Sequence, residues 1–170
     1  MKNEIKIYVA DLAACDIGIL HGVWIDATLE QDDMQEQIGK MLASSPVRGA
    51  EEYAIHDHEG FGACDIGEHA GLEAVHELAS FIERFPDFGS VLFNYFGNLK
   101  DAKKTAEDNY CGVYTSLADY AQELTEETTE IPDSLKYYID YESMAKDMQF
   151  NGDIFTIETG YQEVHIFWNH

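Results

Sequence analysis

The chain has 170 residues, and because 45% of them are apolar and 12% aromatic, the composition supports a folded core and argues against intrinsic disorder. Its 33 acidic and 10 basic residues give a formal net charge of −23, which argues against direct binding to nucleic acid phosphates or to an anionic membrane. Cations and basic protein surfaces are the partners that such a charge favours.

The three cysteines are odd in number, lie far apart and include no C-x-x-C pair, a pattern typical of a reducing cytosolic compartment. They are Cys15, Cys64 and Cys111. The N-terminal sequence MKNEIKIYVADL lacks the apolar segment of a signal peptide, and there is no uninterrupted apolar run of about 18 residues that could span a membrane. We therefore expect a soluble, cytoplasmic protein.

Residues 1–61 are predicted to form a small ββαβ module. Three runs have the composition of strands, at residues 4–10, 19–26 and 51–57. Between the second and the third run, Thr28 and Gln31 form a capping box, which predicts the start of a helix. The apolar stripe of this helix consists of Met34, Ile38, Met41 and Leu42.

Residues 62–102 are predicted to form a helical module. The glycine-rich sequence EGFGACDIG marks a change of composition and predicts a linker. Apolar residues then recur on one helix face, at Leu72, Val75, Ala79 and Ile82. Residues 86–89 interrupt this helix before the run VLFNYFGNL.

Residues 103–170 are predicted to form a module of mixed α and β structure. A short helix near residues 101–108 and a strand around CGVYT precede two acidic helices. GDIFTIE and EVHIFW have the composition of strands, and Gly160 in the sequence TGYQ between them suits a hairpin turn. The whole chain is therefore predicted to have an α+β fold, an elongated chain of three small modules with a small antiparallel sheet in the last.

The acidic stretch at residues 116–147 holds nine carboxylates and two lysines. Ser116 is predicted to cap a first helix, with Asp119 three residues on. The apolar face of this helix consists of Leu117, Tyr120, Ala121 and Leu124, which leaves the opposite face acidic. A second helix is predicted to begin near Pro132 and Asp133, because proline and a carboxylate both suit the first turn. Its apolar set is Leu135, Tyr138, Ile139, Tyr141, Ala145 and Met148.

No pattern of an active site or of a cofactor site stands out. His56 and His58 would face the same side of a strand, as some metal ligands do, but no second pair of His or Cys residues accompanies them. The sequence contains no calcium loop and no phosphate loop, and Cys64 is interpreted as a packing residue rather than a nucleophile. We therefore predict no catalytic residue, no metal and no cofactor.

Four segments are long enough to compare with known families: YVADLAACDIGILHGVWIDA, EEYAIHD, SLADYAQELTEE and IPDSLKYYIDYESMAKDMQFNGDIFTIE. They resemble the corresponding segments of the ArdA antirestriction proteins, in the same order, over residues 7–168. One departure is that Cys15 and Asp16 stand where a Tyr-Asn pair is common in relatives.

The resemblance implies a homodimeric, elongated protein of three modules, encoded on a conjugative plasmid or transposon. Its acidic surface would imitate bent duplex DNA and block the DNA groove of type I restriction and modification enzymes, in the methyltransferase core and in the full complex. The family's antirestriction motif maps onto residues 124–140. A net charge of −23 equals the phosphate charge of about 12 base pairs, so the size of the charge permits such an imitation.

We expect the DNA-like surface to consist of carboxylates from all three modules. The main group is Asp119, Glu123, Glu126, Glu127, Glu130, Asp133, Asp140 and Glu142. The two earlier modules would add Asp32, Asp33, Glu36, Glu73 and Glu77. The candidates for the dimer contact are Tyr137, Tyr138, Ile139, Tyr141, Met144 and Phe155.

Two alternatives from other functional classes remain open at this point. An acidic adaptor would bind another basic DNA-binding protein of the host without copying the shape of DNA, and it would need only one acidic patch. A small hydrolytic enzyme would need carboxylates in apolar surroundings that raise their pKa values. The carboxylates here occupy solvent-facing helical positions in several regions, so the inhibitor that imitates DNA is the favoured hypothesis.

Overall fold

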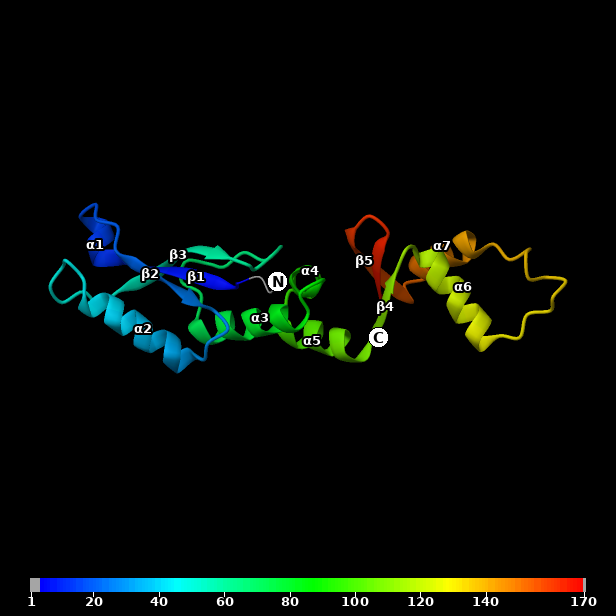
Figure 1. Ribbon diagram of the computed structural model, residues 1–170, viewed down its shortest axis with the longest axis horizontal. Helices are drawn as coiled ribbons and strands as arrows, with labels where there is room; N and C mark the ends of the chain where they lie inside the picture. Colours follow the sequence, from blue (N-terminus) through cyan, green and yellow to red (C-terminus); the bar gives the residue numbers. More distant parts are fainter. Residues whose placement is uncertain (1–3, 170) are drawn as a thin grey trace. The chain divides into compact units, whose positions relative to one another are not determined.

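Figure 1 shows the computed structural model of the chain, which describes residues 4–169. These residues form helices and two small antiparallel sheets of three strands each, which confirms the predicted α+β class. The chain divides into two compact units, Met1–Asn94 and Tyr95–His170. The division into three modules at residues 61 and 102 stays a prediction.

The first unit contains a sheet with the strand order β2-β1-β3. The central strand β1 (Lys6–Asp11) pairs antiparallel with β2 (Gly22–Asp26) and with β3 (Tyr53–Glu59). A short helix, α1 (Leu12–Asp16), follows β1 directly, and the side chain of Asp11 caps it by accepting a hydrogen bond from the amide of Ala14 at 3.3 Å. A helix of five residues is too short to show a periodic apolar stripe, so the sequence did not predict it.

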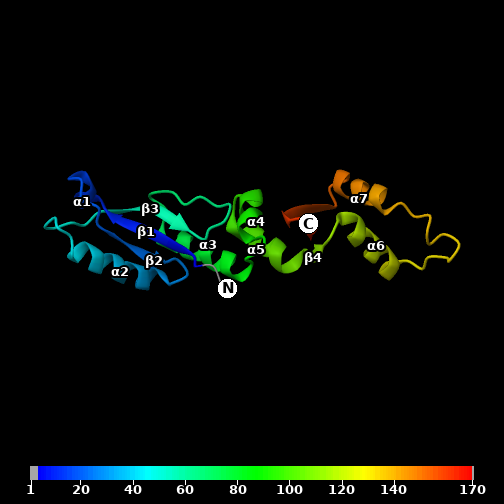
Figure 2. The ribbon, with the colours of Figure 1, turned by 45° about the horizontal axis from the view of Figure 1, so that its top comes forward.

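One face of this sheet packs against α2 (Gln31–Ala43) and α3 (Leu72–Arg84), as Figures 1 and 2 show. The shared core includes Ile7, Val9, Ile25, Met34, Ile38 and Val75. The predicted capping box at Thr28 is wrong. The hydroxyl and the amide of Thr28 both donate to Oδ1 of Asp26, at 2.7 and 2.9 Å, so Thr28 belongs to the turn after β2 and the helix begins later, with Glu30 as its N-cap.

The segment between β3 and α3 is held by α4 (Gly89–Phe96). The amide of Ala63 donates to Oγ of Ser90 at 3.1 Å, and Nδ2 of Asn94 donates to the carbonyl of Ala63 at 2.6 Å. Gly62 has φ +58°, and a Cβ at this position would lie 2.4 Å from Oγ of Ser90, so a larger residue would separate the segment from α4. The predicted linker is therefore an ordered part of the first unit.

Cys64 lies in this segment with its thiol buried and within 3.2 Å of the carbonyl of Ser90, whereas Cys15 is exposed. Burial, together with the charge of Asp65, raises the pKa of Cys64 to about 11. At pH 8 we expect iodoacetamide to label Cys15 first, since a pKa near 11 leaves about 100-fold less thiolate than an ordinary thiol has. Mass spectrometry of timed digests measures the two rates. Equal labelling rates of the two thiols are expected only after unfolding in guanidinium. Equal rates in the native protein would contradict the burial of Cys64.

The second unit contains a sheet with the order β4-β6-β5, formed by β4 (Tyr110–Tyr114), β6 (Glu163–Trp168) and β5 (Ile154–Gly160). The helix α5 (Leu99–Asp108) leads into β4, with Asn98 as its N-cap. The buried ring of Phe167 on β6 lies between Tyr110 and Phe155 of the two neighbouring strands, with ring centroids 5.1 and 5.0 Å apart. The hairpin turn takes its positive φ at Gln162 (+56°) rather than at Gly160.

The helices α6 (Leu117–Thr128) and α7 (Tyr141–Phe150) pack against each other in this unit (Figure 2). Ser116 caps α6 as predicted, since its side chain accepts from the amide of Asp119 at 3.2 Å. The predicted start of the second helix near Pro132 is wrong, because residues 129–140 form a connecting segment with isolated turns. Asp140 is the true N-cap of α7 and accepts from the amide of Ser143 at 3.0 Å. Within residues 4–169, no helix is long and apolar enough to cross a membrane.

Candidate functional site: an acidic surface

The outer side of α6 carries four exposed carboxylates, which we call the α6 ridge. They are Asp119, Glu123, Glu126 and Glu127. Within the described residues no Lys, Arg or His nitrogen lies within 4.0 Å of any of them. Like charges at a spacing of four residues cost a few tenths of a kcal/mol per pair, so the ridge destabilises the helix that carries it.

Polar neighbours hold the ridge in place without neutralising it. The hydroxyl of Thr115 donates to Asp119, and Nε2 of Gln122 donates to Glu126 at 3.1 Å. A hydrogen bond with Glu123, together with burial and the negative charge of that carboxylate, raises the pKa of Tyr114 to about 12. The tyrosine therefore stays protonated at neutral pH and donates to the ridge.

The connecting segment at residues 129–140 continues the acidic surface in a different geometry. Glu130 and Asp133 are exposed in it, and Glu142 is exposed in the first turn of α7. Hydrogen bonds from the backbone and side chain of Ser143 lower the pKa of Asp140, so the cap of α7 remains charged. Because residues 131–139 are not helical, Glu130 and Asp133 do not extend the regular spacing of the α6 ridge.

The first unit has its own exposed carboxylates at the predicted positions. Asp32, Asp33 and Glu36 are exposed on α2, and Glu73 and Glu77 are exposed on α3. One of these groups has a cationic neighbour, since Glu36 forms an exposed ion pair with Lys40 at 3.4 Å. An exposed pair of this kind contributes little to stability, so Glu36 is available to a partner.

The six predicted contact residues differ in exposure. Tyr137 and Tyr138 are 85% and 84% exposed in the connecting segment, whereas Ile139, Tyr141, Met144 and Phe155 are partly buried. The ring of Phe155 stacks between Phe167 and Tyr95 inside the second unit, with its centroid 4.4 Å from that of Tyr95. The sequence analysis did not single out the exposed Phe150, because exposure at a helix end depends on tertiary packing and leaves no mark in a periodic pattern.

Two histidines lie near groups with which a catalytic or metal-binding cluster could form. His56 lies 3.4 Å from the carboxylate of Glu68, and no group of three or more possible metal ligands occurs in residues 4–169. Nε2 of His21 lies 3.4 Å from the hydroxyl of Ser44 and 2.7 Å from the carbonyl of Met41. The carbonyl can only accept, so Nε2 carries a proton and cannot take one from Ser44.

Comparison with known protein families gives a match that covers most of the chain. Residues 7–163 match the sequence model of a family described as Antirestriction protein (ArdA). The match extends from β1 to the start of β6 and so covers most of both compact units. No curated protein sequence matches the chain.

Proposed function

Because the chain belongs to the ArdA family of antirestriction proteins, a family of inhibitors and not of enzymes, we propose that it inhibits type I restriction and modification enzymes by imitating duplex DNA. The acidic surface would occupy the DNA-binding groove of the enzyme and so protect incoming mobile DNA in the cytoplasm. The observation that carries this proposal is the α6 ridge, whose carboxylates are exposed, held by polar neighbours and without a cationic partner among residues 4–169.

The physical basis of such binding is charge complementarity. A groove that binds phosphates is lined with Lys and Arg, and an acidic surface can pair with the same side chains. Each exposed pair contributes only about 0.2–1 kcal/mol, so the affinity would come from many weak contacts. Binding of this kind is steeply dependent on salt and tolerates the loss of one charge.

We propose further that the active protein is a homodimer. Two copies would carry a charge of about −46, the phosphate charge of about 23 base pairs. Tyr137 and Tyr138 are the exposed aromatic residues in the connecting segment, and tyrosine is enriched in protein interfaces. The contact proposed here would combine them with Ile139, Tyr141, Met144 and Phe155.

The double substitution Tyr137→Ala/Tyr138→Ala is expected to weaken the dimer by more than about tenfold, since exposed aromatic anchors of this type contribute the largest share of interface energy. Sedimentation equilibrium measures the dissociation constant. The matched control is Tyr161→Ala, whose ring is 89% exposed at the hairpin turn. An equal effect of the control, or no effect of the double substitution, would place the contact elsewhere.

The function itself is tested by competition. Purified protein is titrated into a type I enzyme bound to labelled DNA at about 50 mM salt, and near-stoichiometric displacement of the DNA is expected. Because DNA binding also weakens with salt, the salt dependence is measured on the complex of protein and enzyme alone. Its affinity should fall on the order of 100-fold at about 200 mM salt. If the protein binds the enzyme but the DNA stays bound at large excess, an acidic adaptor is the better description.

A further inference from the structure

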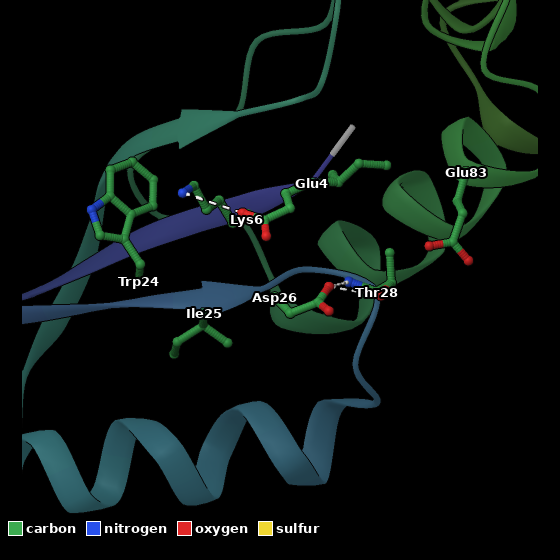
Figure 3. Close-up of a pocket in the computed structure, with 8 residues that line it drawn as sticks. Glu4, Lys6, Trp24, Ile25, Asp26, Thr28 and Glu83 are labelled. Carbon is green, nitrogen blue, oxygen red and sulfur yellow. Dashed lines mark hydrogen bonds and ion pairs between the residues drawn. The ribbon is translucent and has the colours of Figure 1, made fainter. Parts of the chain in front are cut away.

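The open face of the first sheet carries an aromatic pair next to a cation. Tyr8 and Trp24 are paired across β1 and β2, with ring centroids 5.3 Å apart, and the side chain of Trp24 is 38% exposed. Figure 3 shows Trp24 and Lys6 on the side of the sheet opposite to Ile25, which points toward α2. The rings therefore lie outside the hydrophobic core, on a surface that no helix in residues 4–94 covers (Figure 2).

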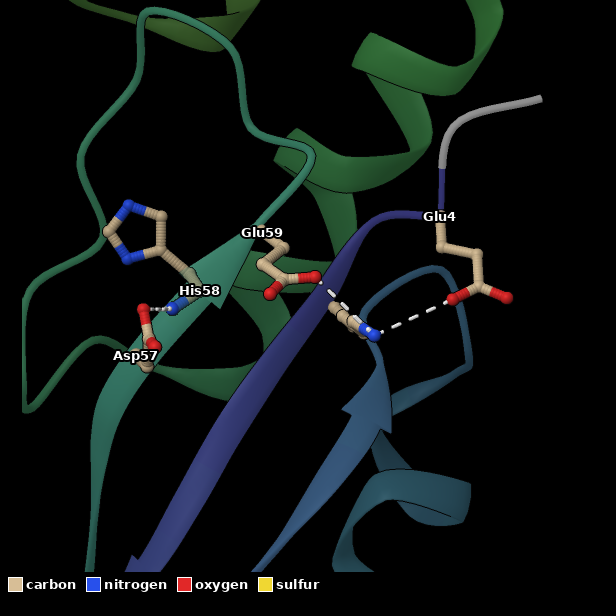
Figure 4. Close-up of polar contacts among 5 residues, drawn as sticks. Glu4, Asp57, His58 and Glu59 are labelled. Carbon is tan, nitrogen blue, oxygen red and sulfur yellow. Dashed lines mark hydrogen bonds and ion pairs between the residues drawn. The ribbon is translucent and has the colours of Figure 1, made fainter. Parts of the chain in front are cut away.

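Lys6 shows what kind of group this surface can hold. Its ammonium lies 5.1 Å from the centroid of the Trp24 ring. It also lies 3.6 Å from a carboxylate oxygen of Glu4 and 3.4 Å from one of Glu59, and Figure 4 shows these two ion pairs as dashed lines. The Lys6 side chain is only 29% exposed, so the cation is held by a ring and two carboxylates in partly desolvated surroundings. Such surroundings strengthen both the ion pairs and the cation–π contact.

A cavity of about 410 Å³ continues from this position along the sheet (Figure 3). Its polar lining includes Glu4, Asp26 and Glu83, so three carboxylates surround it. Asp26 receives both hydrogen bonds from Thr28 on Oδ1. Among residues 4–169 no donor bonds to Oδ2 of Asp26, so this oxygen can bind a donor that enters the cavity.

We propose that this cavity is a docking site for an arginine side chain of the protein partner, and that Lys6 occupies the cation position in the free protein. A guanidinium group is planar, stacks on an indole ring and donates to two carboxylates at once, which a lysine ammonium cannot do. The arginine would belong to the basic enzyme that the chain is proposed to inhibit. The proposal rests on the proposed function only for this identity of the partner.

Lys6 would then compete with the arginine for Trp24 and for the carboxylates of Glu4 and Glu59. When a group of its own chain fills a site for part of the time, the apparent affinity for an external ligand equals the intrinsic affinity multiplied by the fraction of time that the site is free. Lys6→Met removes the competing ammonium but keeps a flexible apolar stem of similar length. The substitution should therefore strengthen arginine binding beyond the effect of the lost positive charge.

The experiment measures the binding of fluorescein-labelled tetra-arginine and tetra-lysine peptides to the full chain by anisotropy. The matched control for charge is Lys40→Met, which also removes one lysine and frees one carboxylate, Glu36, in the same unit. Trp24→Phe and Trp24→Leu test the ring, and thermal unfolding of each variant checks that the first unit remains folded. The emission of Trp24 in a Trp168→Phe background shows whether the peptide reaches the ring.

We expect Lys6→Met to bind tetra-arginine about five- to tenfold more tightly than Lys40→Met, and Trp24→Leu to abolish that difference. Tetra-lysine should bind Lys6→Met several-fold more weakly than tetra-arginine. Equal effects of Lys6→Met and Lys40→Met, or equal binding of the two peptides, would overturn the proposal and leave only general charge attraction. Because no restriction enzyme is used, failure of the proposed function would not alter these results.

Discussion

Replacing Glu123, Glu126 and Glu127 by Gln is expected to weaken inhibition of a type I enzyme by about 30-fold, whereas each single substitution should cost about threefold. The difference follows from many weak charge contacts that add up along one helix. The substitutions keep the length of the side chains and one acceptor oxygen, which can still accept from Tyr114 and Gln122, so the main change is the charge of the α6 ridge. The measurement is the concentration of protein that displaces half of the labelled DNA from the enzyme.

The matched control neutralises three exposed glutamates outside the proposed surface: Glu51, Glu52 and Glu158. It changes the net charge by the same amount and should cost less than about fivefold, through the loss of long-range attraction alone. Thermal unfolding separates binding from folding, because removal of like charges at close spacing should leave α6 equally stable or more stable. A control that loses as much inhibition as the ridge variant would show that net charge, and not position, determines binding.

Phe167→Ala is expected to destabilise the second unit by about 3–5 kcal/mol and to leave the first unit unchanged. The ring is fully buried between Tyr110 and Phe155, and its removal leaves a cavity in the central strand of the sheet. The chain offers one tryptophan in each compact unit, Trp24 and Trp168. Single-tryptophan variants therefore report urea unfolding of the two units separately.

In these variants, the transition followed through Trp168 should move to lower urea, and the transition followed through Trp24 should not move. Phe150→Ala serves as the control, since this ring is 88% exposed and its loss should change stability by less than about 0.5 kcal/mol. If both tryptophans report the same shift in Phe167→Ala, the two units unfold as one cooperative structure.

The features that were predicted correctly depend on residues that lie close together in the sequence. Ser116 caps α6 because its side chain reaches the amide of Asp119, three residues away, and this pairing is visible in the sequence. The apolar stripe of α2 likewise follows from the 3.6-residue period, and its members Met34 and Ile38 are buried.

The errors arose where two local signals competed. Pro132 suits the first turn of a helix, but Asp140 makes the cap that forms, and Leu135 and Tyr138 remain exposed because they have no core to pack against. Thr28 matched the pattern of a capping box, but its hydroxyl donates to Asp26 instead of capping the helix. A choice between two caps depends on the packing of the helix that follows, which the local sequence does not contain.

The exposure of the candidate carboxylates could be predicted, since helix faces opposite an apolar stripe point to solvent. The contact of Lys6 with Trp24 and Glu59 could not be predicted from the sequence, because the three residues lie on three different strands. It depends on the pairing of Lys6 with Asp26 on one side and with Glu59 on the other. Register between strands is set by the whole sheet and by its bulge between Tyr8 and Val9.

The helical geometry of the α6 ridge fixes its linear charge density. Its four carboxylates lie within nine consecutive residues, 119–127, which span about 12 Å of helix axis, so neighbouring charges are about 4 Å apart along it. One strand of DNA carries a phosphate about every 3.4 Å of axis, and the duplex carries one about every 1.7 Å. The linear charge density of the α6 ridge therefore matches that of a single DNA strand rather than that of a duplex. In an imitation of duplex DNA, the second line of charge has to come from another element.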